Sequence, residues 1–231
     1  MKNILLTVLI ITGLVSCTTG NKGSMLVTGE IKGLKKGTLY LKKMNDTLLV
    51  SVDSVFLDGV ETFSLSDEIE SPEIYYLSLN NDKNKQVLFF GDIGTTVINT
   101  KLDKFVFGAT ITGLKNQQLL DEYTEMLDKF SDKNLDLIKA GFEAKKIKDS
   151  IKSDSLQGVS DNLLRRRYYY TTNFAVQHKD AEIAPYLALT ELYNANIKLL
   201  DTVNNSLTKE VKRSKYGVAL DKFIAEIKSK E

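Results

Sequence analysis

The 231-residue chain contains a single cysteine, a single histidine and no tryptophan. A cysteine–histidine zinc site needs more of these residues. A cysteine nucleophile with a histidine base, or a serine–histidine–aspartate triad, would have to use His178 alone. His178 lies between Gln177 and Lys179 near an expected helix end, which favours a solvated or capping role. The sequence therefore predicts a protein that is not an enzyme and that has no metal and no other cofactor.

A strong excess of charge of one sign is also missing. Basic and acidic side chains number 31 and 30. Nucleic acids and anionic membrane surfaces attract proteins with a basic excess, so the balance argues against both as partners. Prolines occur only at Pro72 and Pro185, which excludes a proline-rich linker, while 42% hydrophobic residues are ample for a core.

The one long apolar run stands at the N-terminus. Lys2 precedes the apolar stretch Ile4–Val15, which is too short to span a bilayer and is typical of a secretory signal peptide. The run ends in LVSC, which resembles the lipobox of bacterial lipoproteins. That resemblance implies a signal peptide over residues 1–16, cleavage before Cys17 and acylation of its sulfur. The alternatives are a plain signal peptide with an incidental cysteine, or a buried N-terminal helix.

Residues 17–24 are predicted to be the lipidated cysteine followed by a short polar tether. Seven residues of this kind reach about 25 Å when fully extended, so the folded part would stay close to its membrane. Thr18, rather than aspartate, follows Cys17. By resemblance to Gram-negative sorting signals, this favours the periplasmic face of the outer membrane.

Residues 25–112 show the period of two that is typical of half-buried strands. Leu39 and Leu41, for example, alternate with polar neighbours in TLYLKKM. About eight such segments follow one another with turn signals between them and no helices. Gly91–Gly94 is predicted to be a hairpin turn, because it lacks the Gly-Lys-Ser/Thr of a phosphate loop. The pattern predicts an antiparallel β-sandwich or barrel-like domain.

Residues 113–231 change to a helical period, which makes the expected fold class α+β. Pro185 is predicted to open one helix, whereas Gly158 and Asn204–Ser206 are interpreted as connections. The first apolar stripe is expected to continue on an extension of the same helix or on a second one. The residues of the stripe are Leu120, Tyr123, Leu127 and Phe130, followed by Leu135, Ile138, Phe142 and Ile147.

The string Arg165–Tyr170 (RRRYYY) combines basic and aromatic residues, as sites for single-stranded nucleic acid do. On a helix, however, successive residues are about 100° apart, so the three arginines cannot form one patch. We expect the tyrosines to pack and the arginines to pair with acids or face water. Nucleic acid is not an expected partner.

Two acidic clusters could supply carboxylate pairs for glycoside hydrolysis or oxygen ligands for calcium. Asp67–Glu70 precedes Pro72, and Asp53 with Asp58 spans a strand and a turn. Neither has the spacing of an EF-hand, so both are interpreted as solvated turns.

Aromatic residues of the β region could line a ligand pocket. Because neighbours in a strand point to opposite faces, one residue of each adjacent pair is expected in the core and the other on the outer face. An outward row could be a partner surface, although packing beneath the helices is the preferred interpretation. The residues are Tyr75, Tyr76, Phe89, Phe90, Phe105 and Phe107.

Several segments in order resemble one family. They are VTGEIKGLKKGTLYL, SVDSVFLDGVETFSL, SPEIYYLSL, VLFFGDIGTTVINT and ITGLKNQQLLDEY. Over Leu26–Tyr123 they resemble a domain of unknown function numbered 4369. The resemblance implies a periplasmic lipoprotein of Bacteroidetes-type bacteria and an accessory role. Many members continue into a thioredoxin-like domain with a Cys-x-x-Cys pair. This chain is expected to lack that domain, and without a dithiol no redox activity carries over.

The sequence therefore predicts a non-enzymatic, lipid-anchored cell-envelope protein that acts as an interaction or accessory module. A link to envelope thiol–disulfide systems follows from the family resemblance. The expected partners are the membrane, through the lipid on Cys17, and an envelope protein. A lipoprotein that binds a small molecule or peptide is the alternative, and a carboxylate-dependent hydrolase is a remote one.

Overall fold

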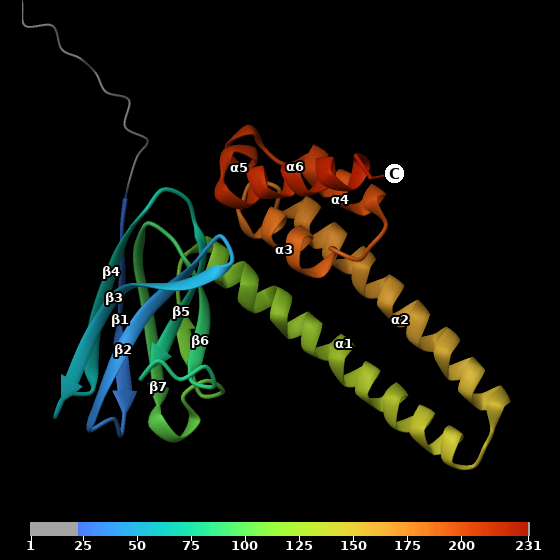
Figure 1. Cartoon of the computed structure of the whole chain (residues 1–231), viewed down its shortest axis with the longest axis horizontal. Helices are drawn as coiled ribbons and strands as arrows, with labels where there is room; N and C mark the ends of the chain where they lie inside the picture. The colour runs from blue at the N-terminus through green and yellow to red at the C-terminus, as the bar shows by residue number, and fades with distance from the viewer. Residues whose placement is uncertain (1–22, 231) are drawn as a thin grey trace, which may run out of the picture.

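The computed structural model describes residues 23–230, which form a two-sheet β domain beside a group of helices (Figure 1). The fold class is α+β, as predicted. The predicted signal peptide and Cys17 lie outside the described residues. The strands are β1 (Gly23–Lys32), β2 (Lys36–Asn45), β3 (Leu48–Asp58), β4 (Thr62–Ile69), β5 (Glu73–Leu79), β6 (Gln86–Gly91), β7 (Gly94–Lys101) and β8 (Thr110–Thr112).

The strands form two four-stranded sheets in the orders β4-β1-β7-β8 and β3-β2-β5-β6. All pairs are antiparallel except β1 with β7, which is parallel. The connection Gly91–Gly94 is not the hairpin turn that the sequence predicted, because it carries the chain from β6 in one sheet to β7 in the other. The strand β1 begins at Gly23, inside the range predicted as tether.

Alternating apolar residues from both sheets fill the space between them. Leu39 and Leu41 of β2 and Leu77 of β5 are completely buried, as the period of two predicts. Tyr75 and Phe89 also point into this core, and their rings stack at 5.9 Å. The β domain thus has a hydrophobic core of its own.

The helices are α1 (Lys115–Lys146), α2 (Ser150–Gln177), α3 (Ile183–Glu191), α4 (Ile197–Ser206), α5 (Lys209–Arg213) and α6 (Lys215–Lys228), with a 3-10 turn, η1 (Leu102–Lys104), before β8. The apolar stripe continues on α1 itself. Gly158 is inside α2, and Asn204–Ser206 is the end of α4, so neither is a connection. Pro185 lies in the first turn of α3, where its missing N–H costs no hydrogen bond.

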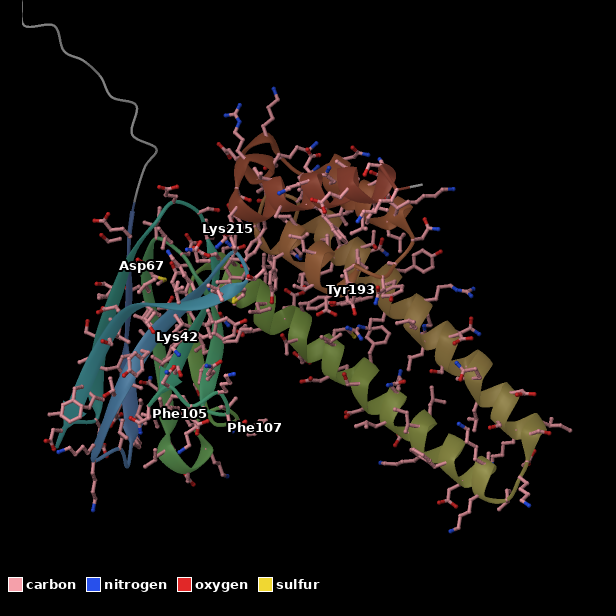
Figure 2. The ribbon with its side chains drawn as sticks, viewed as in Figure 1. Lys42, Asp67, Phe105, Phe107, Tyr193 and Lys215 are labelled. Atoms are coloured by element: carbon pink, nitrogen blue, oxygen red, sulfur yellow. The ribbon has the colours of Figure 1, made fainter. Side chains whose placement is uncertain are left out.

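A third cluster of buried residues joins the two halves of the molecule. Ile74 and Phe90 on the outer face of their sheet pack beneath helical residues that include Leu120, Tyr123 and Leu187. Phe90 contacts the rings of Tyr186 and Tyr216 edge-on. The aromatic residues of the outer face are therefore covered by helices, as preferred from the sequence. In contrast, Phe107 is 99% exposed and points away from the body (Figure 2).

Across residues 23–230, none of the helices combines the length and the apolar character needed to cross a membrane.

Candidate functional site

The most prominent feature outside the compact body is the hairpin of α1 and α2. Both helices extend together well beyond the remaining elements, and a short turn joins their far ends (Figure 1). Lys148 in this turn has a positive φ of 57°, and the Asp149 carboxylate accepts a hydrogen bond from the Lys152 N–H at 2.9 Å. The reversal is thus fixed by a left-handed residue followed by a helix N-cap.

Two buried amides hold the near end of α1 against the body. The Gln117 Oε1 accepts a hydrogen bond from the Phe90 N–H of β6 at 2.7 Å. The Asn116 Oδ1 accepts one from the Ile183 N–H at 3.0 Å, and its Nδ2 donates to Glu182 at 2.8 Å. Because each amide satisfies a group on another element, the start of the hairpin cannot shift without leaving a buried polar group unpaired.

Aromatic side chains pack between α1 and α2 next to these buried amides. Tyr123 is 1% exposed, and its hydroxyl hydrogen-bonds the Thr171 hydroxyl at 2.7 Å. Burial raises the pKa of Tyr123 to about 12. The ring lies 5.9 Å from Tyr170 and 5.3 Å from Phe174. The proximal part of the hairpin is therefore a rigid extension of the core.

The string Arg165–Tyr170 lies on this part of α2. Arg167 forms an ion pair with Glu191 of α3, whereas Arg165 and Arg166 are exposed. Tyr170 packs against the aromatic residues of α1, and Tyr169 is 54% exposed. The three arginines point in different directions around the helix axis, but Arg165, Tyr168 and Tyr169 line one hollow together with Lys198 of α4.

The distal part of the hairpin is held by little more than its own two helices. Ala144 is its one fully buried apolar side chain. Seven large apolar side chains here are exposed and not part of a core, with exposed fractions between 45% and 83%. They are Leu135, Ile138, Phe142, Ile147, Ile151, Val159 and Leu164.

A groove of about 200 Å³ runs between the helices in this region. Ile138, Gly141 and Phe142 line the groove on the α1 side. Gln157 and Ser160 line the α2 side. Leu164 lines a second hollow, which adjoins the first at Ser160. The sequence stripe identified Ile138 and Phe142 as an apolar face, but it did not show that this face lacks a partner within the described chain.

A charged cluster connects the β domain to α6. The Lys43 ammonium lies 2.6 Å from Asp67 and 3.6 Å from Glu73, and the Tyr75 hydroxyl donates to Asp67 at 2.7 Å. Lys215 of α6 pairs with Glu73 and donates to the Met44 carbonyl at 3.0 Å. Figure 2 shows Lys215 where the C-terminal helices meet the sheets. Burial and the Asp67 hydrogen bond raise the pKa of Tyr75.

The prediction that both acidic clusters form solvated turns is only partly correct. Asp67 lies in β4, partly buried, and its carboxylate is bonded to Lys43. Asp53 accepts hydrogen bonds from the N–H groups of Ser54 and Ser66, and Asp58 pairs with Lys36 at the surface. Among residues 23–230 there is no group of three or more histidine or acidic side chains able to hold a metal ion.

His178 is the C-cap of α2, and its ring lies 4.5 Å from that of Phe174. This position agrees with the capping role predicted for it.

Comparison with known families concerns the β domain. Residues 25–120 match the family described as a domain of unknown function, DUF4369. The match covers β1 to β8 and the first turns of α1, as the sequence resemblance predicted, and most of the hairpin lies outside it. No curated protein and no solved structure matches the chain.

Proposed function

We propose that this protein is a lipid-anchored component of the cell envelope that acts by binding a protein partner, not by catalysis. Its place would be the periplasmic face of the outer membrane, with acylated Cys17 as the anchor. The observation that supports the binding role is the distal α1–α2 hairpin, which has a groove with exposed apolar side chains along its α1 side.

The groove suits an amphipathic helix of a partner. Ile138 and Phe142 are four residues apart on α1, so they form one continuous ridge. A helix that docks between α1 and α2 would bury this ridge and make a three-helix packing from an incomplete two-helix one. Apolar side chains left in water at several neighbouring positions are typical of such interaction surfaces.

The rest of the molecule holds the base of the α1–α2 hairpin in place. The Gln117 and Asn116 hydrogen bonds and the buried Tyr123 fix the base of the hairpin on two other elements. A base that is fixed before binding lowers the entropy cost of ordering the groove when a partner binds. Accessory function beside an envelope thiol–disulfide protein fits this arrangement, because the module would contribute binding while the partner supplies the dithiol.

The two alternative functions, a carboxylate-dependent hydrolase and a small-molecule or peptide binding protein, receive less support. Asp67 and Glu73 lie on either side of the Lys43 ammonium, and each is paired with a lysine, which favours a structural role over hydrolysis. Tyr75, Phe89 and Phe105 are core residues and do not line a ligand pocket. These aromatic residues therefore give no support to a small-molecule site in the β domain.

Site-directed photo-cross-linking in the native host tests the proposal. A benzoylphenylalanine at Ile138 should give one defined cross-linked protein from the envelope fraction, whereas the same group at Val218, which is 56% exposed on α6, should not. Exchange of Gln157 for arginine, on the opposite wall of the groove, should suppress the product. Equal products at both positions, or none at Ile138, would contradict partner binding through the groove.

Anchoring is tested separately by intact mass and membrane fractionation of the wild type and of Cys17→Ser. The wild type should carry the acyl mass and sediment with membranes, and the variant should do neither. If both remain soluble and unmodified, the anchor and the proposed location are wrong.

A further inference from the structure

We propose that the end of the α1–α2 hairpin inserts into an anionic lipid surface. The tip surface consists of Phe142, Ile147, Ile151 and the lysines Lys145, Lys146, Lys148 and Lys152. The proposal goes beyond protein binding in the groove, because Ile147 and Ile151 do not line the groove and lie at the outermost turn.

The apolar part of the tip surface is unusually exposed for side chains of its size. The exposed fractions are 68% for Phe142, 66% for Ile147 and 83% for Ile151. Ile147 caps the end of α1, and Ile151 lies in the first turn of α2, so the two residues flank the reversal of the chain. No described element packs over this end of the hairpin (Figure 1). Ile147 and Ile151 thus project at the reversal itself, and Phe142 lies next to them at the end of the groove.

The charges around these three side chains are mostly positive. Between residues 142 and 152 the four lysines are accompanied by two carboxylates, Glu143 and Asp149. Asp149 is engaged with the Lys152 N–H as the N-cap of α2. All four lysines are exposed, and none of them forms an ion pair with another described residue. Their ammonium groups are therefore available to an external anion.

A phospholipid surface with anionic headgroups complements both parts of the tip. The apolar side chains can enter the boundary between headgroups and acyl chains, and lysine stems can lie along it while the ammonium groups reach phosphates. A contact between the tips of two copies is disfavoured, because it would bring four lysines of one copy against four of the other. The near-neutral charge of the whole chain argued against an anionic membrane as a partner, but that balance conceals the local excess at the tip.

A fluorescent reporter at the tip gives a direct test. Cys17 is the only cysteine, so full-length chains with Cys17→Ser and either Ile147→Cys or Val218→Cys can each be labelled with a polarity-sensitive nitrobenzoxadiazole group. With vesicles of phosphatidylcholine and phosphatidylglycerol, the label at 147 should shift to shorter wavelength and gain intensity. It should not do so with phosphatidylcholine alone, and the label on α6 should change with neither. All chains share the same N-terminal segment, so its own lipid binding cannot produce this difference.

Charge reversal tests the lysines. Each lysine near an anionic surface is worth about fivefold in partitioning. The combined exchange Lys145→Glu, Lys146→Glu, Lys148→Glu and Lys152→Glu should therefore weaken vesicle binding of the tip by more than 100-fold. Added salt at about 0.5 M should also weaken vesicle binding of the wild-type tip, because it screens the lysine charges. Circular dichroism should show the same helix content in every chain, because the exchanged side chains are exposed.

Three results would overturn the proposal: no spectral shift at position 147 with anionic vesicles, an equal shift with neutral vesicles, or a shift without vesicles that grows with protein concentration. The last result would indicate self-association of the tip. The outcome is separable from that of the groove, because cross-linking at Ile138 can succeed or fail whichever result the label at 147 gives.

Discussion

Buried tyrosine hydroxyls are the side chains whose ionisation the fold changes most. Burial raises the pKa of Tyr123 to about 12, and it raises the pKa of Tyr186 to about 12 as well. Tyr75 and Tyr216 are shifted in the same direction, and burial is again the largest cause. In the unfolded chain these hydroxyls would ionise near pH 10. The folded state must therefore keep its tyrosines protonated at a pH where the unfolded state does not.

This difference predicts a loss of stability in alkali. A group whose pKa is raised on folding contributes its full stability below the unfolded pKa and loses it as pH rises through the folded pKa. For Tyr123 alone, the free energy of unfolding should fall by about 2 kcal/mol between pH 10 and pH 12. Urea unfolding at several pH values measures the loss, and absorbance at 295 nm follows the tyrosinate.

Tyr123→Phe provides the matched control for this prediction. The variant loses the Thr171 hydrogen bond, so it should be less stable than the wild type near neutral pH, by about 1 kcal/mol. Its stability should decline less steeply above pH 10, because one titrating hydroxyl is gone. If the free energy of unfolding fell equally steeply with pH in both proteins, Tyr123 would not contribute to the loss of stability in alkali.

Alanine substitutions at two glycines test the continuity of α2 and the close pairing of β1 with β7. A Cβ on Gly158 in α2 would meet nothing within 4 Å, whereas a Cβ on Gly29 in β1 would lie 1.8 Å from the Ile98 carbonyl oxygen of β7. Gly158→Ala should therefore stabilise the protein by about 0.5–1 kcal/mol through helix propensity. Gly29→Ala should cost about 3 kcal/mol, because the parallel β1–β7 pair must separate.

Thermal and urea unfolding of both variants, read against the wild type, measure these changes. A destabilising Gly158→Ala would mean that α2 is not continuous at this position. A neutral Gly29→Ala would mean that β1 and β7 are not paired closely there.

The strands were predictable because alternation depends on neighbouring residues alone. Leu39 and Leu41 are buried as their period indicates. The pairing of β1 with β7 depends on residues about 70 positions apart, and no local pattern encodes its direction. For the same reason Gly91–Gly94 was predicted as a hairpin turn: its glycines indicate a reversal, but not which sheet the next strand joins.

The candidate site was predictable only in part. Helical spacing identified Ile138 and Phe142 as one apolar face, since i and i+4 positions always share a face. Whether such a face is covered depends on tertiary packing, and here the described chain provides no element to cover it. Gly158 was interpreted as a connection because glycine weakens helices, but the helix around it is long enough to tolerate that cost.

The molecule as a whole is expected to unfold as one unit, despite its division into sheets and helices. The cluster around Ile74 and Phe90 is shared by both halves. The Ile74 N–H donates to the Tyr216 hydroxyl at 2.9 Å, and Lys215 pairs with Glu73. These contacts link β5, β6 and α6, so loss of either half would expose the buried surface of the other. The distal hairpin shares none of them.

Native-state hydrogen exchange of Phe89→Ala tests this coupling. Phe89 is completely buried between the two sheets and belongs to the core of the β domain alone. Its truncation should lower the free energy of opening by about 3–5 kcal/mol. If the halves are coupled, the amides of α6 should lose as much protection as those of β5, although Phe89 is not part of the helical clusters. Amides of the distal hairpin, which open locally, should not change. Loss of protection in β5 without loss in α6 would show that the two halves unfold independently and that the shared cluster does not bind them into one unit.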